Sequence, residues 1–271
     1  MTAFDDLAKR LTEEDALLVS VLASRGSVPR KKGAWMAVFQ RGMVGTIGGG
    51  HLEFQALAEA RKRLAGAPGE AVIRYALGPS LGQCCGGDVQ LQFERVSAPD
   101  LASLKHRLDL PGAPVALFGG GHVGHALVRV FGQLPVAVHW IDSRDEVFPE
   151  QVPANVVCEH SDPVQSATAS LAPGSQVLIM SFSHAEDLEV VAACLLRQRE
   201  RGDLPYIGLI GSRTKWAAFR HRLAERGFSE SELAHVTCPI GVPGIAGKAP
   251  EVIAVAVAAQ ILQNLPVQPG D

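Results

Sequence analysis

Short apolar runs alternate with longer helix-like stretches through the second half of the chain. The runs read as strands because they are brief and are bounded by turn residues. They cover residues 114–118, 136–141, 155–158, 177–180, 206–210 and 235–238, and the helical stretches cover residues 123–131, 162–171, 185–201 and 213–226, with a last helix starting near Pro250. Since parallel strands need long crossover connections, this alternation predicts a mostly parallel sheet covered on both faces.

The first half of the chain has a different pattern, in which pairs of strand-like runs flank turn-rich segments. One pair covers residues 17–23 and 34–40, the other covers residues 71–77 and 89–96, and a helix with apolar positions at Leu52, Leu57 and Leu64 is expected over residues 51–64. Two prolines and a glycine between residues 109 and 114 interrupt both patterns and mark a boundary. The sequence therefore predicts an α/β protein: a smaller N-terminal α+β domain, residues 1–110, and a C-terminal Rossmann-type doubly wound parallel sheet, residues 111–271.

A glycine-rich turn stands between the first apolar run of the C-terminal domain and the helix after it. Gly119, Gly121 and Gly124 match the spacing Gly-x-Gly-x-x-Gly, and Asp142 follows at the end of the next strand. In Rossmann folds these glycines form a tight turn, admit phosphate to the backbone and let helix and strand approach, while the acid binds a ribose hydroxyl. The order of strand, turn, helix, strand and acid favours a nucleotide-binding turn over a glycine-rich loop with no ligand.

Three segments of the N-terminal domain are further candidates. Gly48-Gly49-Gly50 precedes a helix and would form either an anion cradle or a plain turn. Arg30-Lys31-Lys32 is read as a solvated turn rather than an anion site. The strongest signal is Cys84-Cys85, which glycines bracket, because core packing alone does not explain such a pair. An exposed thiolate there would be a nucleophile, a sulfur carrier or a ligand for a soft metal, and the alternative is a pair of small residues in a loop.

Composition and charge narrow the class of protein. The 271 residues are 47% hydrophobic, and the net charge of −3 offers no field that would attract nucleic acid or an anionic membrane. The acidic start of the chain lacks the pattern of a signal peptide, and the apolar segment over residues 252–262 is too short to span a bilayer. The five cysteines include no Cys-x-x-Cys pair, so we expect neither a disulfide framework nor a zinc site. We expect a cytoplasmic location.

With these residues collected, the chain resembles the xanthine dehydrogenase accessory proteins, the XdhC and CoxI type of molybdenum-cofactor chaperone. Seven segments, in this order along the chain, carry the resemblance: residues 26–30 with 33–36, residues 45–53, residues 82–87, the glycine turn 119–124, Asp142-Ser143-Arg144, residues 208–213 and residues 238–241. The family's last motif reads Thr-Pro-Glu-Glu-Ile-Ala, and here the stretch Lys248 to Ala254 lacks the threonine.

The resemblance implies a carrier rather than an enzyme. Such a protein would bind the molybdenum cofactor while a cysteine desulfurase installs the terminal sulfur, and would pass it to an apo xanthine dehydrogenase or a related molybdenum hydroxylase. Either Cys84 or Cys85 would lie near molybdenum. The full set of candidate cofactor-binding residues is Cys84, Cys85, Gly48, Gly49, Gly50, Gly119, Gly121, His122, Gly124, Asp142, Gly211 and Ser212. We expect the ligand cleft where the Gly119 turn faces the Cys84-Cys85 loop. The sequence does not decide whether the chain forms a homo-oligomer.

The competing class is an NAD(P)-dependent oxidoreductase, because Gly119, Gly121, Gly124 and Asp142 are also what a dinucleotide needs. An enzyme would require a substrate-side acid or base, and His184, after the strand that ends near Ser181, is the best placed. A lone histidine is more often structural or solvated than catalytic. Nicotinamide bound after purification would favour the oxidoreductase, and bound pterin with molybdenum would favour the chaperone.

Overall fold

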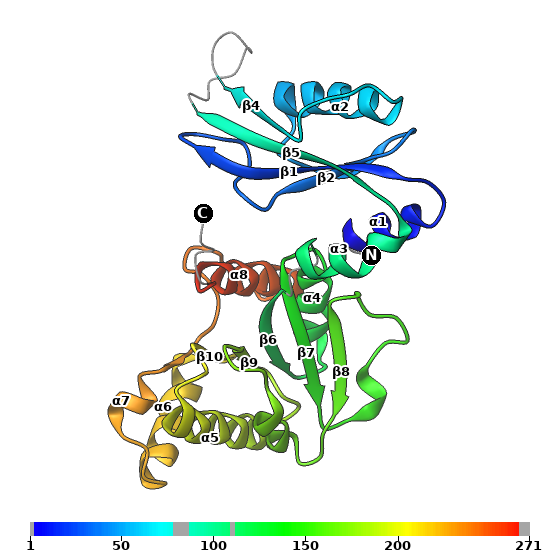
Figure 1. The fold of residues 1–271 in the computed structure, drawn as a ribbon. Helices are drawn as coiled ribbons and strands as arrows, with labels where there is room; N and C mark the ends of the chain where they lie inside the picture. Colours follow the sequence, from blue (N-terminus) through cyan, green and yellow to red (C-terminus); the bar gives the residue numbers. More distant parts are fainter. Residues whose placement is uncertain (1–2, 78–86, 109–111, 266–271) are drawn as a thin grey trace. The chain divides into compact units, whose positions relative to one another are not determined.

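The computed structural model describes residues 3–77, 87–108 and 112–265, and its ribbon is drawn in Figure 1. The chain divides into two compact units, with the boundary between residues 110 and 111. Each unit is built on its own β-sheet. We refer to the N-terminal part as unit 1 and to the C-terminal part as unit 2.

Unit 1 is a five-stranded antiparallel sheet with helices on both faces. The strand order is β3-β2-β1-β5-β4. The strands are β1 (Ala16–Arg25), β2 (Trp35–Val38), β3 (Met43–Gly45), β4 (Val72–Ala76) and β5 (Asp88–Val96), and the helices are α1 (Ala3–Leu11), α2 (Gly50–Leu64) and α3 (Leu101–Leu108), the last preceded by the short 3-10 turn η2 (Ala98–Asp100).

Alternation of side chains along the strands of unit 1 explains its two layers of helices. Leu17 on β1 joins the cluster under α2, whereas its neighbour Leu18 joins the cluster under α1 and α3, because successive side chains point to opposite faces of a sheet. The two expected strand pairs are confirmed, since β1 pairs with β2 and β4 with β5. The pairing of β1 with β5 then joins the two hairpins into one sheet.

Unit 2 is a parallel sheet whose strand order is β11-β10-β9-β6-β7-β8, the doubly wound order of Rossmann folds. The strands are β6 (Ala113–Phe118), β7 (Val136–Asp142), β8 (Val156–His160), β9 (Gln176–Ile179), β10 (Tyr206–Leu209) and β11 (Val236–Thr237). The helices are α4 (His122–Phe131), α5 (His184–Arg201), α6 (Arg213–Glu225), α7 (Glu230–Leu233) and α8 (Pro250–Gln263), with 3-10 turns η3 (Asp145–Val147) and η4 (Val164–Ser170). The predicted fold class is confirmed for both parts of the chain.

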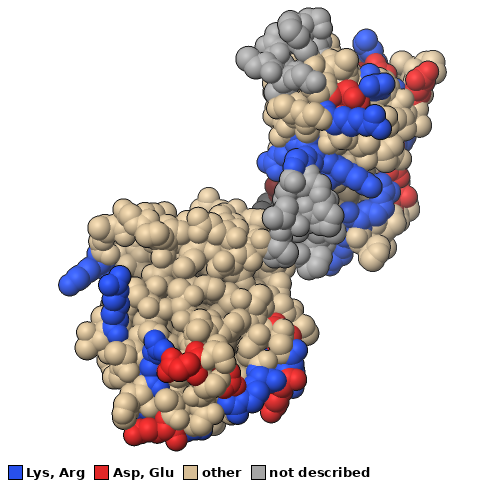
Figure 2. Space-filling view, turned by 90° about the vertical axis from the view of Figure 1, so that its left-hand side faces the viewer, with Lys and Arg blue, Asp and Glu red and all other residues tan. Residues whose placement is uncertain are grey.

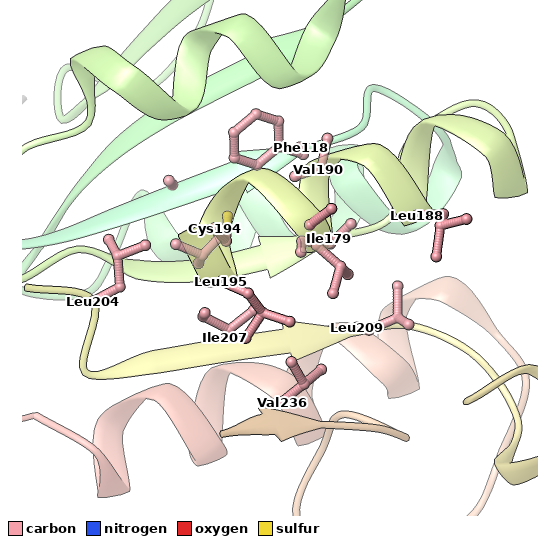
Figure 3. Close-up of a cluster of buried hydrophobic side chains, with 14 of the residues drawn as sticks. Phe118, Ile179, Leu188, Val190, Cys194, Leu195, Leu204, Ile207, Leu209 and Val236 are labelled. Atoms are coloured by element: carbon pink, nitrogen blue, oxygen red, sulfur yellow. The ribbon is translucent and has the colours of Figure 1, made fainter. Parts of the chain in front are cut away.

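The central strand β6 sends apolar side chains to both faces of the sheet in unit 2. Val115 and Leu117 pack against α4 and α8, whereas Ala116 and Phe118 pack on the side of α5. Figure 3 shows Phe118, Ile179 and Ile207 from three strands in the same cluster as Cys194 and Leu195 of α5. Cys194 is fully buried.

Two elements of unit 2 differ from the sequence-based expectation. The stretch 162–171, expected as a helix, forms the 3-10 turn η4 over residues 164–170. Its apolar residues Val164, Ala167 and Leu171 are buried nonetheless, so the spacing of about three to four residues correctly predicts a buried face while the hydrogen-bond pattern differs. The short helix α7, which Ser229 and Glu232 cap in a reciprocal pair, is not among the expected elements.

Candidate functional site

The glycine turn lies at the point where the strand order in the sheet of unit 2 reverses. The strand β6 has β7 on one side and β9 on the other, and ligands of open α/β sheets bind at the carboxyl ends of the strands at such a point. Gly119 has a φ of +123°, and a Cβ added to it would lie 2.0 Å from the carbonyl oxygen of Met180, just after β9. The Trp140 indole donates a hydrogen bond to the Gly119 carbonyl at 3.0 Å. Only glycine fits this position.

The other two glycines of the motif have opposite surroundings. A Cβ on Gly124 would lie 2.1 Å from the Gly119 carbonyl oxygen, so this glycine allows α4 to pack against the turn. A Cβ on Gly121 would meet nothing within 4 Å, and the φ of this residue, −78°, also suits any amino acid. Gly121 and His122 are exposed where α4 begins, and the first N–H groups of a helix have no acceptor within it. The turn therefore leaves room for an anion over Gly121.

Asp142 is 1% exposed, and its carboxylate is bound by the protein itself. Oδ2 accepts hydrogen bonds from the Gly120 N–H at 2.5 Å and from Nη2 of Arg144 at 3.0 Å, and Oδ1 accepts from the Arg144 N–H and Nε, each at 2.9 Å. Burial raises the pKa of Asp142, but these hydrogen bonds outweigh it and hold the pKa below its usual range. A ribose diol would have to displace one of these donors.

The side chains that surround this carboxylate are not identified by the sequence pattern. The Arg144 guanidinium lies over the ring of Phe182, 4.2 Å from its centroid. Glu186 accepts hydrogen bonds from the Ser143 hydroxyl at 2.8 Å and from the Phe182 N–H at 3.1 Å, so it ties the loop after β7 to the loop after β9. Arg144 belongs to a segment of the family resemblance, and Phe182 follows a predicted strand end. Neither signal indicates that the two stack.

Gly211 and Ser212 have local structural roles at the end of β10. Ser212 caps α6 by accepting a hydrogen bond from the Lys215 N–H, and a Cβ on Gly211 would lie 2.5 Å from Cδ of Lys215. That space lets the Lys215 ammonium reach Asp187 at 2.6 Å and the Ile210 carbonyl at 2.8 Å. The ion pair is almost fully buried and joins α6 to α5. The part of Gly211 and Ser212 in cofactor binding stays a prediction.

The Gly48–Gly50 segment of unit 1 is bound by a carboxylate of its own helix. Glu53 accepts hydrogen bonds from the N–H groups of Ile47 at 3.1 Å and Gly49 at 3.2 Å, and from the Thr46 hydroxyl. The Gly48 N–H donates to the Thr46 hydroxyl at 3.0 Å. Such N–H groups do bind an anion, as a glycine cradle would, but the anion here is Glu53. A phosphate at this place would compete with that side chain.

The remaining candidates of unit 1 contribute less to the described site. Cys84 and Cys85 lie outside the described residues, so their proximity to the Gly119 turn stays a prediction. Arg30, Lys31 and Lys32 are exposed, as a solvated turn would have them. Figure 2 shows Lys and Arg gathered across part of unit 1, whereas both signs of charge mix toward one end of unit 2.

Other features narrow the choice of site within the described residues. No group of three or more His, Cys, Asp and Glu side chains there could hold a metal ion. None of the described helices has the length and apolar character needed to cross a membrane. A hollow of about 330 Å³ is lined by Pro114, Ala137 and Val157, near the amino ends of their strands, which is the end of a parallel sheet opposite to its ligand sites.

Two family models together match most of the chain. The model described as the XdhC Rossmann domain matches residues 115–261, which include the glycine turn and Asp142. The model described as the XdhC and CoxI family matches residues 10–76 of unit 1.

Individual relatives extend over the whole chain. The uncharacterized protein YqeB of Escherichia coli K12 is 28% identical over 280 residues, which cover 100% of this chain and 47% of YqeB. The chain thus spans about half the length of this relative. A crystal structure described as a xanthine dehydrogenase from Bacillus halodurans matches with a TM-score of 0.76 and 19% identity, and covers 97% of this chain and 96% of that one. At that identity the match shows the fold alone.

Proposed function

The chain belongs to the XdhC family, and on this premise we propose that it carries the molybdenum cofactor during the maturation of a xanthine dehydrogenase or a related molybdenum hydroxylase. Proteins of this family are accessory proteins rather than enzymes. The proposed role has three steps: the chain binds the cofactor, holds it while a cysteine desulfurase supplies the terminal sulfur, and delivers it to the apo form of the client enzyme.

The observation that carries this proposal is the open space over Gly121 at the start of α4. The molybdenum cofactor ends in a phosphate, and the N–H groups and positive dipole end of a helix stabilise such an anion. His122 is exposed at the same turn and offers a further donor from its ring. The turn thus supplies the chemistry that the phosphate end of this cargo requires.

The molybdenum end of the cofactor needs a softer partner, and we assign it to Cys84 or Cys85 on the family resemblance. The thiolate is the form of cysteine that binds metals. Burial raises the pKa of the thiols of Cys158, Cys194 and Cys238, which disfavours their thiolate forms. They are therefore poorer candidates than the vicinal pair.

An NAD(P)-dependent oxidoreductase is not proposed. The ribose of a dinucleotide needs a free carboxylate at the position of Asp142. Here both oxygens of Asp142 accept hydrogen bonds from Gly120 and Arg144. The turn therefore offers a place for phosphate without the acceptor that a ribose diol requires.

The test is to express the chain in a host that makes the molybdenum cofactor and to measure pterin, molybdenum and nicotinamide in the purified protein. We expect pterin and molybdenum together, and their loss in the double variant Cys84→Ser, Cys85→Ser, since serine keeps the size of cysteine but is a hard ligand. Cys158→Ser is the control and should retain the cofactor. A parent protein that holds nicotinamide and no pterin would contradict the proposal.

A further inference from the structure

A large aromatic side chain stands exposed beside the glycine turn. Phe182 follows β9, and 66% of its surface is accessible to solvent. One face of its ring is covered by the Arg144 guanidinium, whose carbon lies 4.2 Å from the ring centroid. Exposed phenylalanine has a cost, because its apolar surface orders water without any gain from packing. The uncovered part of the ring is open to contact with a ligand.

Phe182 is held in place from several directions. Its N–H donates a hydrogen bond to Glu186, which also accepts one from the Ser143 hydroxyl. The Arg144 side chain over the ring is itself fixed by two hydrogen bonds from its guanidinium to the Asp142 carboxylate. A ring fixed in this way loses little conformational freedom when it binds, and such preorganisation favours affinity.

The ring also adjoins the phosphate-binding turn through a short chain of contacts. Asp142 accepts hydrogen bonds from both the Gly120 N–H and Arg144, and Arg144 stacks on Phe182. Gly119 lies against the Met180 carbonyl, two residues before Phe182. The turn, the Asp142–Arg144 pair and Phe182 thus make one continuous group at the carboxyl ends of β6, β7 and β9. A single small ligand could touch both the turn and the ring.

We propose that Phe182 stacks on the planar ring of the ligand whose phosphate binds at the Gly119–Gly124 turn, so that the site selects phosphate esters that carry a heteroaromatic ring. This inference rests on the proposed function, in which the ligand is a pterin. Stacking suits any fused heteroaromatic ring, because each has a π face. Pterins and guanine nucleotides share this chemistry.

Three probes separate the contribution of the ring from that of the phosphate. Neopterin monophosphate supplies a pterin, GMP supplies a purine, and ribose 5-phosphate supplies neither. We expect both ring-bearing probes to bind the full-length parent more tightly than ribose 5-phosphate does, by calorimetry. If only one of the two ring-bearing probes shows this gain, the inference stands for that ring alone.

Substitution at Phe182 gives the direct test. Phe182→Ala should weaken the ring-bearing probes about tenfold, within the range that stacking contributes per base, and should leave ribose 5-phosphate within about twofold. Phe182→Trp should restore the difference, because indole offers a larger π face. Phe54→Ala is the matched control, since Phe54 is 67% exposed on α2 of unit 1, and it should change no affinity.

The outcomes separate this inference from the proposed function. Equal losses of affinity for all three probes in Phe182→Ala would give Phe182 a purely structural role and would overturn the inference. A parent that binds neither ring-bearing probe would also overturn it. Gly121→Val should weaken all three probes, because its side chain fills the space for phosphate. If Gly121→Val does so while Phe182→Ala changes nothing, the phosphate turn stands and the stacking role fails. If the parent purifies without molybdenum cofactor while Phe182→Ala still weakens only the ring-bearing probes, the stacking role stands and the carrier role fails.

Discussion

Asp142 joins three segments of unit 2 through one buried carboxylate. It accepts one hydrogen bond from the Gly120 N–H of the glycine turn and three from Arg144. The Arg144 guanidinium in turn covers the ring of Phe182. The carboxylate therefore fixes the shape of the turn through Gly120, next to the open space at Gly121. In this arrangement Asp142 is a positioning residue for the turn.

The first prediction concerns Asp142→Asn and its dependence on pH. The folded pKa of Asp142 is lowered, so its charged hydrogen bonds stabilise the protein above the unfolded pKa of about 3.9 and are lost as pH falls through the folded value. At pH 7 the variant should be about 2 kcal/mol less stable than the parent in urea unfolding. The difference should shrink below about pH 4.

Asp145→Asn is the control for that measurement, because Asp145 is exposed three residues further along the same loop. It should change the free energy of unfolding by about 0.5 kcal/mol or less at either pH. A stability difference for Asp142→Asn that is the same at pH 7 and pH 3 would show that the carboxylate's charge contributes nothing to the fold.

At the scale of single residues the sequence predicts positions better than partners. The place of Asp142 follows from counting along a strand, because a strand end fixes where its last side chain lies. The hydrogen bonds between Arg144 and Asp142 cannot be predicted in this way, since residues two apart in a loop face each other only for certain backbone angles. The stacking of Arg144 on Phe182 does not follow either, because the two residues belong to different loops.

The glycine turn is the element in which neighbouring residues have the most distinct tasks. Gly119 adopts a left-handed conformation against Met180, Gly124 lets the start of α4 pack against the turn, and Gly121 borders open space. The motif predicts a separate task for each glycine: a tight turn, close approach of phosphate to the backbone, and close packing of the helix. The structure gives Gly119 and Gly124 packing roles and shows open space at Gly121, where we propose that the ligand binds.

The second prediction follows from that division. Gly124→Ala should lower stability by about 1–3 kcal/mol, because its Cβ would lie 2.1 Å from a backbone oxygen and the helix would have to shift. Gly121→Ala should stay within about 0.5 kcal/mol of the parent, since its φ and surroundings accept a methyl group. Thermal unfolding of both variants measures this. Equal destabilisation would contradict the assignment of Gly121 to ligand binding.

Long elements are predictable from local pattern, and short ones are not. The strands β6 and β7 are apolar runs that helix-like segments separate, which is why their existence is clear from the sequence. The strand β3 has three residues and offers no period to detect. The helix α1 is absent from the expected elements although it buries Phe4, Leu7 and Leu11 at helical spacing, so its signal is present in the sequence but brief.

The whole molecule combines two units that bury separate cores. Unit 1 has clusters on both faces of an antiparallel sheet, and unit 2 has clusters on both faces of a parallel one. Each arrangement follows from strand alternation together with the helices between strands. The family of the chain is also within reach of the sequence, because its matching segments are spread over both units.

From the sequence alone, the proposed carrier role rests on that family resemblance. Fold does not determine function, and a Rossmann-type unit serves oxidoreductases and carriers alike. The structure adds the hydrogen bonds that the Asp142 carboxylate accepts from Gly120 and Arg144. This argues against a dinucleotide by a physical reason that the motif does not contain.

Cofactor transfer is the measurement that tests the central proposal most directly. The chain, purified from a host that makes the molybdenum cofactor, is mixed with an apo molybdenum hydroxylase, and hydroxylase activity is followed over time. We predict that the parent activates the apo enzyme and that Gly121→Val, folded by circular dichroism, does so much less because it retains less cofactor. A parent that carries no cofactor, or that leaves the hydroxylase inactive while free cofactor activates it, would contradict the carrier role.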